Sequence, residues 1–163
     1  MAKRKKYYKR EFLRQHYATK TFISNDGLHV ERDYFDKNAN ELKTYEPKIY
    51  ENKYGQRLIC LKEHGDIMIA ELVISCYCAP KPKDGKDYEI EHIDGDLSND
   101  HRNNLRWVEA TPEYLTKKKV MLNNILINKK KQWYKDRKIK VLKDGTITQN
   151  NDVCHPFPDF VTF

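Results

Sequence analysis

The chain has 163 residues, 39% of them hydrophobic and 34% charged, and Lys plus Arg outnumber Asp plus Glu by 31 to 24. This length suits one domain with appended arms, and the net charge of +7 favours a polyanionic partner, although cations that serve solubility alone are the alternative. Residues 1–10 lack the apolar core of a secretory signal, and the longest apolar segment is shorter than the roughly 20 residues of a membrane span. We therefore expect a soluble intracellular protein.

The basic residues gather in three runs along the chain. Clustered cations are typical of proteins that bind nucleic acid, because each phosphate that they neutralise releases counterions. The runs are Lys3-Arg4-Lys5-Lys6, Lys117-Lys118-Lys119 and Lys129-Lys130-Lys131. The clusters therefore favour nucleic acid as the partner over cations that serve solubility alone.

The N-terminal part predicts an arm, a hairpin and a loop. Residues 1–20 form a basic, aromatic-containing arm, either a short helix or a partly disordered tail. Residues 21–30 form a β-hairpin, because apolar residues flank the turn sequence Asn-Asp-Gly. Residues 31–47 are polar and irregular, and we expect them to form a surface loop.

A second strand pair and a helix follow. Residues 54–61 and 66–69 are predicted to pair around a Glu-His-Gly turn. Residues 67–78 have helical spacing, since apolar side chains recur at i, i+3, i+4 and i+7 from Ile69. Two prolines and an Asp-Gly pair then end the helix and make residues 80–85 a linker.

Two strands and a long helix are predicted next. Residues 88–92 and 105–108 are the strands, and they flank a polar loop. Thr111 is a suitable N-cap for a helix that reaches about residue 134, because a proline occupies its first position. Its apolar residues are expected to face inward; they are Leu115, Leu122, Ile125 and Leu126.

The segment over residues 91–108 carries the residue types suited to chemistry on a phosphate. His92 ends the first strand, where an imidazole can deprotonate a water molecule aimed at phosphorus. The adjacent carboxylate of Glu91 can hold a divalent ion on the scissile phosphate, and the ion stabilises charge on the leaving oxygen. Asn99 and Asn104 can pin the loop through hydrogen bonds to its backbone.

This segment resembles the HNH nucleases of phages and mobile introns, homing endonucleases among them. The family pattern is a His-Ile-Asp-Gly start, a spaced Asn and then Asn-Leu-x-Trp-Val, and residues 92–108 match it without gaps. The resemblance implies an α+β fold with a ββα-metal core (HNH, or His-Me finger), an N-terminal β-hairpin layer and basic terminal extensions. It also implies that His92 is the general base, Glu91 a metal ligand and Asn104 the brace of the hairpin, with Mg²⁺ or Mn²⁺ as cofactor.

A second resemblance concerns the N-terminal part of the chain. Residues 22–30 are similar to the short module that often precedes the HNH unit in these endonucleases, so the likeness covers roughly residues 20–115. We therefore expect four parts in chain order. They are a basic arm over 1–20, a hairpin and helix module over 21–80, an HNH ββα module over 86–134, and a C-terminal part over 135–163 with a hairpin at 138–148 and an aromatic tail.

The sequence departs from the family at the last metal ligand, an Asn or His in the first turn of the helix. Gapless counting places that ligand at Glu113, whereas alignment by the helix cap gives Tyr114 or Leu115, neither of which can bind Mg²⁺. The helix dipole alone favours Glu at this position, and Glu91 is also compatible with an ordinary strand residue. If Glu113 is a ligand, it should converge with Glu91 beside His92.

Two functions follow from the resemblance. The first is a metal-dependent DNA endonuclease whose single site nicks one strand at a time. The second is a catalytically degenerate HNH-fold protein that binds DNA or serves in the assembly of a phage particle, with the tail over 149–163 docking on a phage protein. The expected location is the host cytoplasm, or the virion for an assembly protein.

Further basic residues are predicted to contact the phosphate backbone of double-stranded DNA. Arg102 and Arg106 flank the predicted strand pair and can clamp phosphates, with plain solvent exposure as the alternative. The long helix supplies nonspecific contacts through six lysines. These are Lys117, Lys118, Lys119, Lys129, Lys130 and Lys131.

Overall fold

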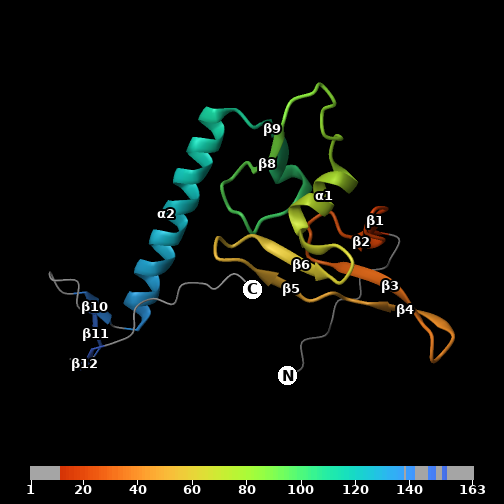
Figure 1. The fold of residues 1–163 in the computed structure, drawn as a ribbon, viewed down its shortest axis with the longest axis horizontal. Helices are drawn as coiled ribbons and strands as arrows, with labels where there is room; N and C mark the ends of the chain where they lie inside the picture. Colours follow the sequence, from red (N-terminus) through yellow and green to blue (C-terminus); the bar gives the residue numbers. More distant parts are fainter. Residues whose placement is uncertain (1–11, 138, 142–146, 150–151, 154–163) are drawn as a thin grey trace. The chain divides into compact units, whose positions relative to one another are not determined.

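The described part of the chain comprises residues 12–137, 139–141, 147–149 and 152–153 of a computed structural model (Figure 1). It is an α+β protein of small antiparallel sheets and helices, which confirms the predicted class. The chain divides into two compact units, residues 1–111 and 112–163, which are taken in turn. Among the described residues, no helix has the length and the apolar character that are needed to cross a membrane.

A four-stranded antiparallel sheet begins the description of unit 1. Its strands, in the order in which they pair, are β1 (Arg14–His16), β2 (Thr21–Ile23), β3 (Val30–Asp36) and β4 (Glu41–Tyr45). The pairing of Ile23 with Val30 confirms the hairpin predicted over 21–30. Of the expected basic arm, residues 1–11 lie outside the described residues, and its later part supplies the edge strand β1.

The expectation of a surface loop over 31–47 is wrong, because most of this segment forms the hairpin of β3 and β4. Polar and aromatic cross-strand pairs join the two strands where apolar alternation is lacking. Lys43 Nζ lies 2.6 Å from Asp36 Oδ2, and the rings of Tyr34 and Tyr45 meet edge to face with centroids 5.6 Å apart. Hydrophobic periodicity does not detect such a strand pair.

A three-stranded antiparallel sheet and helix α1 follow in unit 1. The strands are β5 (Ile49–Glu51), β6 (Arg57–Leu61) and β7 (Gly65–Met68), and α1 spans Ile69–Tyr77. The register pairs Leu61 with Gly65, which confirms the predicted strand pair and its turn. The helix predicted over 67–78 is confirmed by α1.

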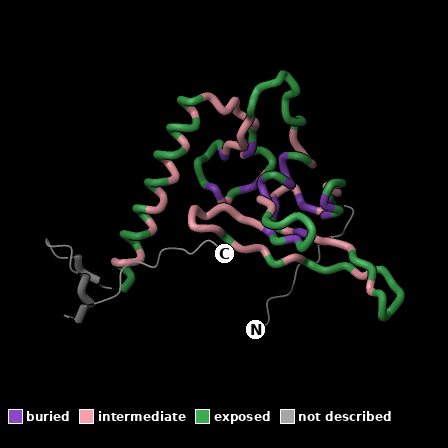
Figure 2. Tube along the Cα trace, in the orientation of Figure 1, coloured by how far each residue is buried: buried purple, intermediate pink, exposed green. Residues whose placement is uncertain are grey.

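The core of unit 1 forms around α1, which contacts strands of all three sheets of the unit. Figure 2 shows the buried residues, in purple, concentrated in α1 and in the strands near it. Burying each large aliphatic side chain contributes about 1.5–3 kcal/mol, so this cluster is the main source of stability in the unit. Its members include Ile23, Ile59, Leu61, Leu72, Val73, Ile74 and Leu105.

Strands β8 (Tyr88–His92) and β9 (Leu105–Glu109) form a two-stranded antiparallel hairpin, as the sequence predicted. Directly paired residues share a face, so His92 and Leu105 lie on one face and Glu91 and Arg106 on the other. Leu105 is 5% exposed and belongs to the core, and Trp107 packs against it. The face that carries His92 is therefore the inner face of the hairpin.

Unit 2 consists of helix α2 (Pro112–Asp136) and an antiparallel sheet of β10 (Ile139–Val141), β11 (Ile147–Gln149) and β12 (Asp152–Val153). α2 and the β10–β11 pair confirm the predicted long helix and the hairpin over 138–148. The predicted tail over 149–163 lies mainly outside the described residues.

The expectation that four apolar residues of α2 face inward is wrong for Leu115, which is 44% exposed. Leu122, Ile125 and Leu126 are half-buried, and the described helix has no fully buried residue. Within its own unit the helix contacts the short strand β10, which is too small to cover a full apolar face. Periodicity identified this helix correctly but not the depth of its burial.

Candidate active site around His92

His92 ends strand β8 and turns its side chain inward. Its partner across the hairpin is the core residue Leu105, and 5% of the His92 side chain is exposed. His92 is part of a strand, so a rigid element sets the direction of its ring. Catalytic side chains need such rigid support to keep their geometry.

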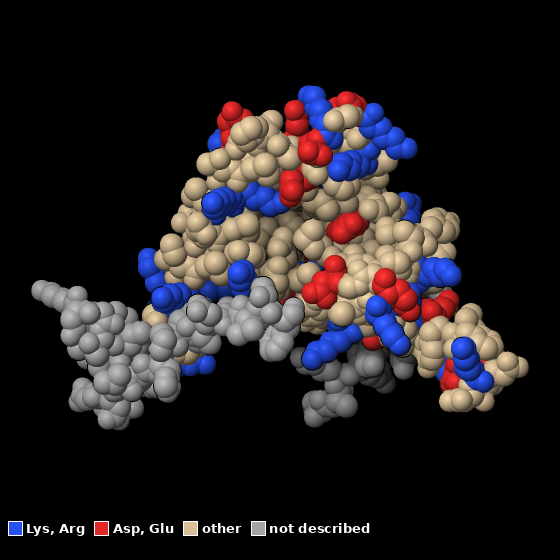
Figure 3. All heavy atoms as spheres, in the orientation of Figure 1, with Lys and Arg blue, Asp and Glu red and all other residues tan. Residues whose placement is uncertain are grey.

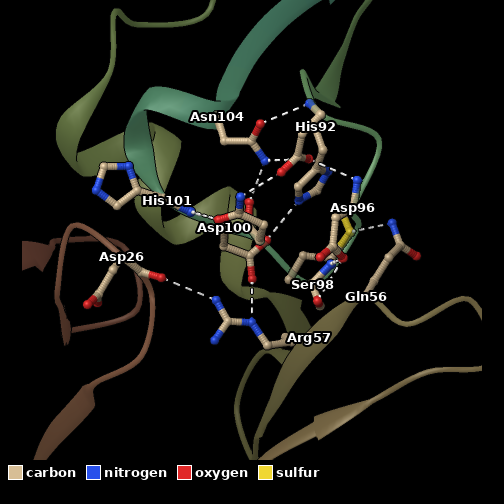
Figure 4. A network of polar contacts seen from close by, with 12 residues as sticks. Asp26, Gln56, Arg57, His92, Asp96, Ser98, Asp100, His101 and Asn104 are labelled. Carbon is tan, nitrogen blue, oxygen red and sulfur yellow. Dashed lines mark hydrogen bonds and ion pairs between the residues drawn. The ribbon is translucent and has the colours of Figure 1, made fainter.

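Asp100, a residue of the loop between β8 and β9, holds the ring of His92 (Figure 4). The Nε2 atom of His92 lies 2.9 Å from Asp100 Oδ1, and Arg57 Nε donates to Asp100 Oδ2 at 2.8 Å. The exposed fractions of the side chains are 1% for Asp100 and 11% for Arg57. Arg57, on β6, also donates to the main-chain oxygen of Asp26 at 3.3 Å. One buried chain of hydrogen bonds thus joins β6, the loop and β8.

The partners of Asp100 determine which ring nitrogen of His92 carries the proton. A carboxylate paired with a guanidinium accepts hydrogen bonds and donates none, so Nε2 of His92 must be the donor. The lone pair of the neutral ring then lies on Nδ1. In the described part of the chain, every buried side-chain N or O atom has a hydrogen-bond partner. Nδ1 of His92 has no hydrogen bond to these residues, so it is not a buried atom and reaches solvent.

Asn104, Asn99 and Asp94 brace the loop that carries Asp100. Asn104 Oδ1 accepts from the main-chain N–H of Asp94 at 3.0 Å, while Asn104 Nδ2 donates to Asp94 Oδ1 at 2.9 Å and to the main-chain oxygen of Asn99 at 2.7 Å. Asn99 Nδ2 donates to Asp94 Oδ2 at 2.6 Å. The bonds from Asn99, and then those from Asn104, hold the pKa of Asp94 below its usual range. Both predicted hairpin-stabilising residues lie in this brace, and their energetic contribution stays a prediction.

The loop also meets the turn between β2 and β3. Arg102, which begins the 3-10 turn η2 (Arg102–Asn104), donates its main-chain N–H to the oxygen of Asn25 at 2.9 Å. Gly27 in the same turn has a φ of +67°, and an added Cβ would lie 2.6 Å from Ile69 Cγ2 and 3.2 Å from the Cβ of Asp100. Only glycine combines this backbone conformation with so close an approach.

The two predicted metal ligands belong to different units. Glu91 lies on the hairpin face opposite His92, where its Oε2 is 2.5 Å from Arg106 Nε. Glu113 is exposed in the first turn of α2, in unit 2. Among the residues that the structure describes, no group of three or more His, Cys, Asp or Glu could hold a metal ion.

Unit 1 therefore offers one of the predicted carboxylates to a divalent cation. Mg²⁺ prefers oxygen ligands and usually keeps several waters while it binds one or two carboxylates and the phosphates of a substrate. Glu91 fits such a site by its chemistry, and a cation there would compete with the guanidinium of Arg106, whose side chain is 60% exposed. The ligand roles of Glu91 and Glu113 stay predictions.

The residues predicted to contact DNA lie in both units. In unit 1 Arg102 is exposed, whereas Arg106 is engaged by Glu91. In unit 2 helix α2 carries seven lysines against two acidic residues, and Figure 3 shows blue side chains along it. The lysine runs at 117–119 and 129–131 are exposed or half-buried, and helical rise separates them by about 18 Å.

Arg57 and Asp100 are candidate site residues that sequence reasoning missed. They are 43 residues apart in the chain, and their pairing depends on how β6 packs beside the loop. One signal was present, because Asp100 follows the candidate base His92 by eight positions. In a loop that also contains Asp94 and Asp96, this acidic residue did not stand out.

No protein-family model and no curated protein matches this sequence. Among solved structures, the chain is similar to one that shows DNA binding and cleavage by the HNH homing endonuclease I-HmuI, with a TM-score of 0.45 and 20% identity. The match covers 85% of this chain and 77% of the other.

Proposed function

We propose that this chain is an HNH-type DNA endonuclease with His92 as its general base. The observation that carries the proposal is the geometry of His92, because Asp100 holds Nε2 at 2.9 Å and leaves Nδ1 to accept a proton. The same histidine opens the segment over 92–108 that resembles the HNH nucleases. Geometry and sequence pattern therefore support the same imidazole.

The proposed reaction is hydrolysis of a phosphodiester bond in one DNA strand. Nδ1 of His92 takes a proton from water as the water oxygen attacks phosphorus, and the bond from phosphorus to the leaving sugar oxygen breaks. Solvent supplies the proton that completes the leaving alcohol. Glu91 is the residue of unit 1 that would hold a divalent ion, which would stabilise the negative charge on the leaving oxygen. The role of Glu113, in unit 2, as a further ligand stays a prediction.

Unit 2 supports the DNA-binding part of the proposal through the charge of α2. Its lysines outnumber its acidic residues by seven to two, so the helix can neutralise several phosphates. In unit 1 the exposed Arg102 lies in the same loop as Asp100. We propose that it contacts the DNA backbone near the reacting phosphate. These contacts position a duplex and carry no sequence information.

A plasmid assay tests the proposed function. Purified protein is incubated with supercoiled plasmid in Mg²⁺ or Mn²⁺, with EDTA as the control, and the products are separated on a gel. We expect relaxed circles to precede linear DNA, because a single site opens one strand at a time. Relaxation that fails in both metals, or that persists unchanged in EDTA, would contradict the proposal.

The second candidate function is a protein that binds DNA without cleaving it, as in the assembly of a phage particle. One observation favours it: Arg106 forms an ion pair with Glu91 and so occupies a predicted metal ligand. The segment proposed to dock on a phage protein, over 149–163, lies mainly outside those residues. Salt-sensitive gel retardation without nicking would support this candidate, and the loss of both activities would exclude both functions.

A further inference from the structure

We propose that Arg57 and Asp100 are positioning residues that keep the proton of His92 on Nε2, so that Nδ1 is always the basic nitrogen. The inference rests on the proposed function, because it assigns the residues that hold the general base. Since Arg57 belongs to β6, it also gives the three-stranded sheet of unit 1 a part in the reaction.

The first support is the direction of the two hydrogen bonds at Asp100. A guanidinium stays protonated and only donates, so the oxygen that faces Arg57 at 2.8 Å must accept. The second oxygen faces His92 Nε2 at 2.9 Å and, in a carboxylate, must accept as well. Arg57 therefore fixes Asp100, and Asp100 in turn selects the Nε2–H form of His92.

The second support is burial, which prevents water from replacing these partners. The exposed fractions of the Asp100 and His92 side chains are 1% and 5%. Hydrogen bonds to charged groups are about twice as strong as those between neutral groups, and little solvent screens this one. The turn at Gly27 closes one side, since a Cβ there would lie 3.0 Å from Arg57 Nη2.

Asp100→Asn tests the assignment, because an amide has one accepting and one donating end. Arg57 requires the oxygen, so the amide turns its NH₂ group toward His92. Nε2 must then accept, the proton moves to Nδ1, and Nδ1 no longer acts as a base. We expect the nicking rate at saturating DNA to fall by about 10²–10⁴-fold, while the Kd for DNA stays within about twofold.

A second change separates this tautomer effect from a simple loss of structure. The double variant combines Asp100→Asn with Arg57→Gln. The oxygen of the glutamine at position 57 can accept a hydrogen bond from the NH₂ group of the asparagine at position 100. The oxygen of that asparagine can then face His92. We expect the Nε2–H form to return and the nicking rate to rise about tenfold above that of the single variant. If the two residues served structure alone, the double variant would lose further activity.

Nitrogen NMR of the full-length protein with isotope-labelled histidine reads the tautomer without any cleavage, and a His92→Gln spectrum assigns the signal. We expect Nε2–H in the wild type, Nδ1–H in Asp100→Asn and Nε2–H again in the double variant. The matched control is Asp36→Asn, which removes a carboxylate 2.6 Å from Lys43 in the β3–β4 hairpin. It should change neither the tautomer nor the nicking rate.

The outcomes distinguish this inference from the proposed function. A wild-type Nδ1–H signal, an Nε2–H signal that persists in Asp100→Asn, or a double variant slower than the single one each overturns the inference. The wild-type spectrum alone suffices if the single variant does not fold. Failure of the wild type to nick DNA in either metal overturns the proposed function, and the tautomer series still decides whether Asp100 sets the form of His92.

Discussion

Asp100 has both carboxylate oxygens occupied, one by His92 and one by Arg57, and only 1% of its side chain is exposed. A buried ion pair of this kind adds little net stability, because desolvation of the two charges offsets their attraction. Loss of one partner has a much larger effect, since the remaining charge stays buried alone. Removal of either Arg57 or Asp100 alone should therefore destabilise the fold far more than the intact pair stabilises it.

We expect Arg57→Met to lower the free energy of unfolding by about 3–5 kcal/mol, because Asp100 would keep a buried charge without its guanidinium. Urea unfolding of the full chain, followed by circular dichroism at neutral pH, measures the difference from wild type.

The matched control for this prediction is Arg106→Met. Arg106 also pairs with a carboxylate, that of Glu91, but the exposed fractions of the two side chains are 60% and 28%. Exposed pairs contribute about 0–1 kcal/mol, so this variant should lie close to wild type. Equal losses in the two variants would show that burial does not distinguish the pairs.

Gly27 supports a prediction about close packing. Gly27→Ala forces a φ of +67° on a residue with a Cβ and places that atom 2.6 Å from Ile69 Cγ2. We expect a loss of about 2–5 kcal/mol in the free energy of unfolding, from backbone strain and overpacking together. Gly85→Ala is the control, because Gly85 has a φ of +82° with nothing within 4 Å of an added Cβ. It should lose about 1–2 kcal/mol, and a loss as large as that of Gly27→Ala would refute the close contact.

Sequence distance separates the site residues that could be predicted from those that could not. Asn99 and Asn104 bond to Asp94, which lies five and ten residues away, so the loop sequence itself contains the interaction. Arg57 meets Asp100 across 43 residues, and no local pattern indicates that contact. Geometry that depends on tertiary packing arises only in the folded chain.

At the scale of an element, the loop between β8 and β9 is held together by carboxylates. Asn99 and Asn104 lower the pKa of Asp94 from its ordinary 3.8, and the main-chain N–H and hydroxyl of Ser98 lower that of Asp96. A carboxyl with a lowered folded-state pKa contributes stability that is fully present above the unfolded value and is lost as pH falls through the folded value. The loop should therefore loosen in acid, below about pH 3.8.

Hydrogen exchange of the loop amides measures this acid sensitivity. The protection factor of the Asp94 amide, which donates to Asn104 Oδ1, should fall as pH drops from about 5 to 2. In Asp94→Asn the same amide should start less protected and change less, because the titrating carboxylate is gone. A wild-type protection factor that is constant over this range would contradict the account of the loop.

Whole elements were predictable where their side chains repeat with a regular period. α1 and the β6–β7 pair follow apolar periodicity and the turn residues between strands, and the sequence predicted them. The β3–β4 hairpin has charged and aromatic residues on exposed faces, so its pattern is that of a polar loop. Its two strands are stabilised by pairing with each other, and the sequence of either segment alone does not indicate that pairing.

At the scale of the whole molecule, charge is concentrated unevenly. The net charge is +7, and α2 holds seven lysines against two acidic residues. If α2 binds the DNA backbone, removing three lysines should weaken binding of every sequence alike and reduce its salt dependence, because fewer counterions are released.

The salt dependence of DNA binding tests this role of α2. For the triple variant Lys129→Ala, Lys130→Ala and Lys131→Ala, the slope of log K against log salt should fall in magnitude by about 2–3. Asn124→Ala, an exposed neutral position of the same helix, is the control and should keep the wild-type slope. An unchanged slope in the triple variant would remove α2 from the DNA-binding surface.

The assembly of unit 1 is the part of the molecule least available to sequence reasoning. α1 contacts strands of three different sheets, and Leu105 of β9 joins the same core. Because of this packing, the hairpin face that carries Leu105 and His92 faces the core, and His92 lies within hydrogen-bond distance of Asp100. The sequence predicted the strands and the histidine, but not that the three-stranded sheet would supply Arg57.

The most direct test of the central claim is the nicking rate of His92→Ala relative to wild type, measured at saturating DNA in the same metal. General-base catalysis contributes about 10²–10⁴-fold, so we expect a fall of that size with DNA binding retained. A rate within about twofold of wild type would show that His92 is not the base, whatever else the protein does to DNA.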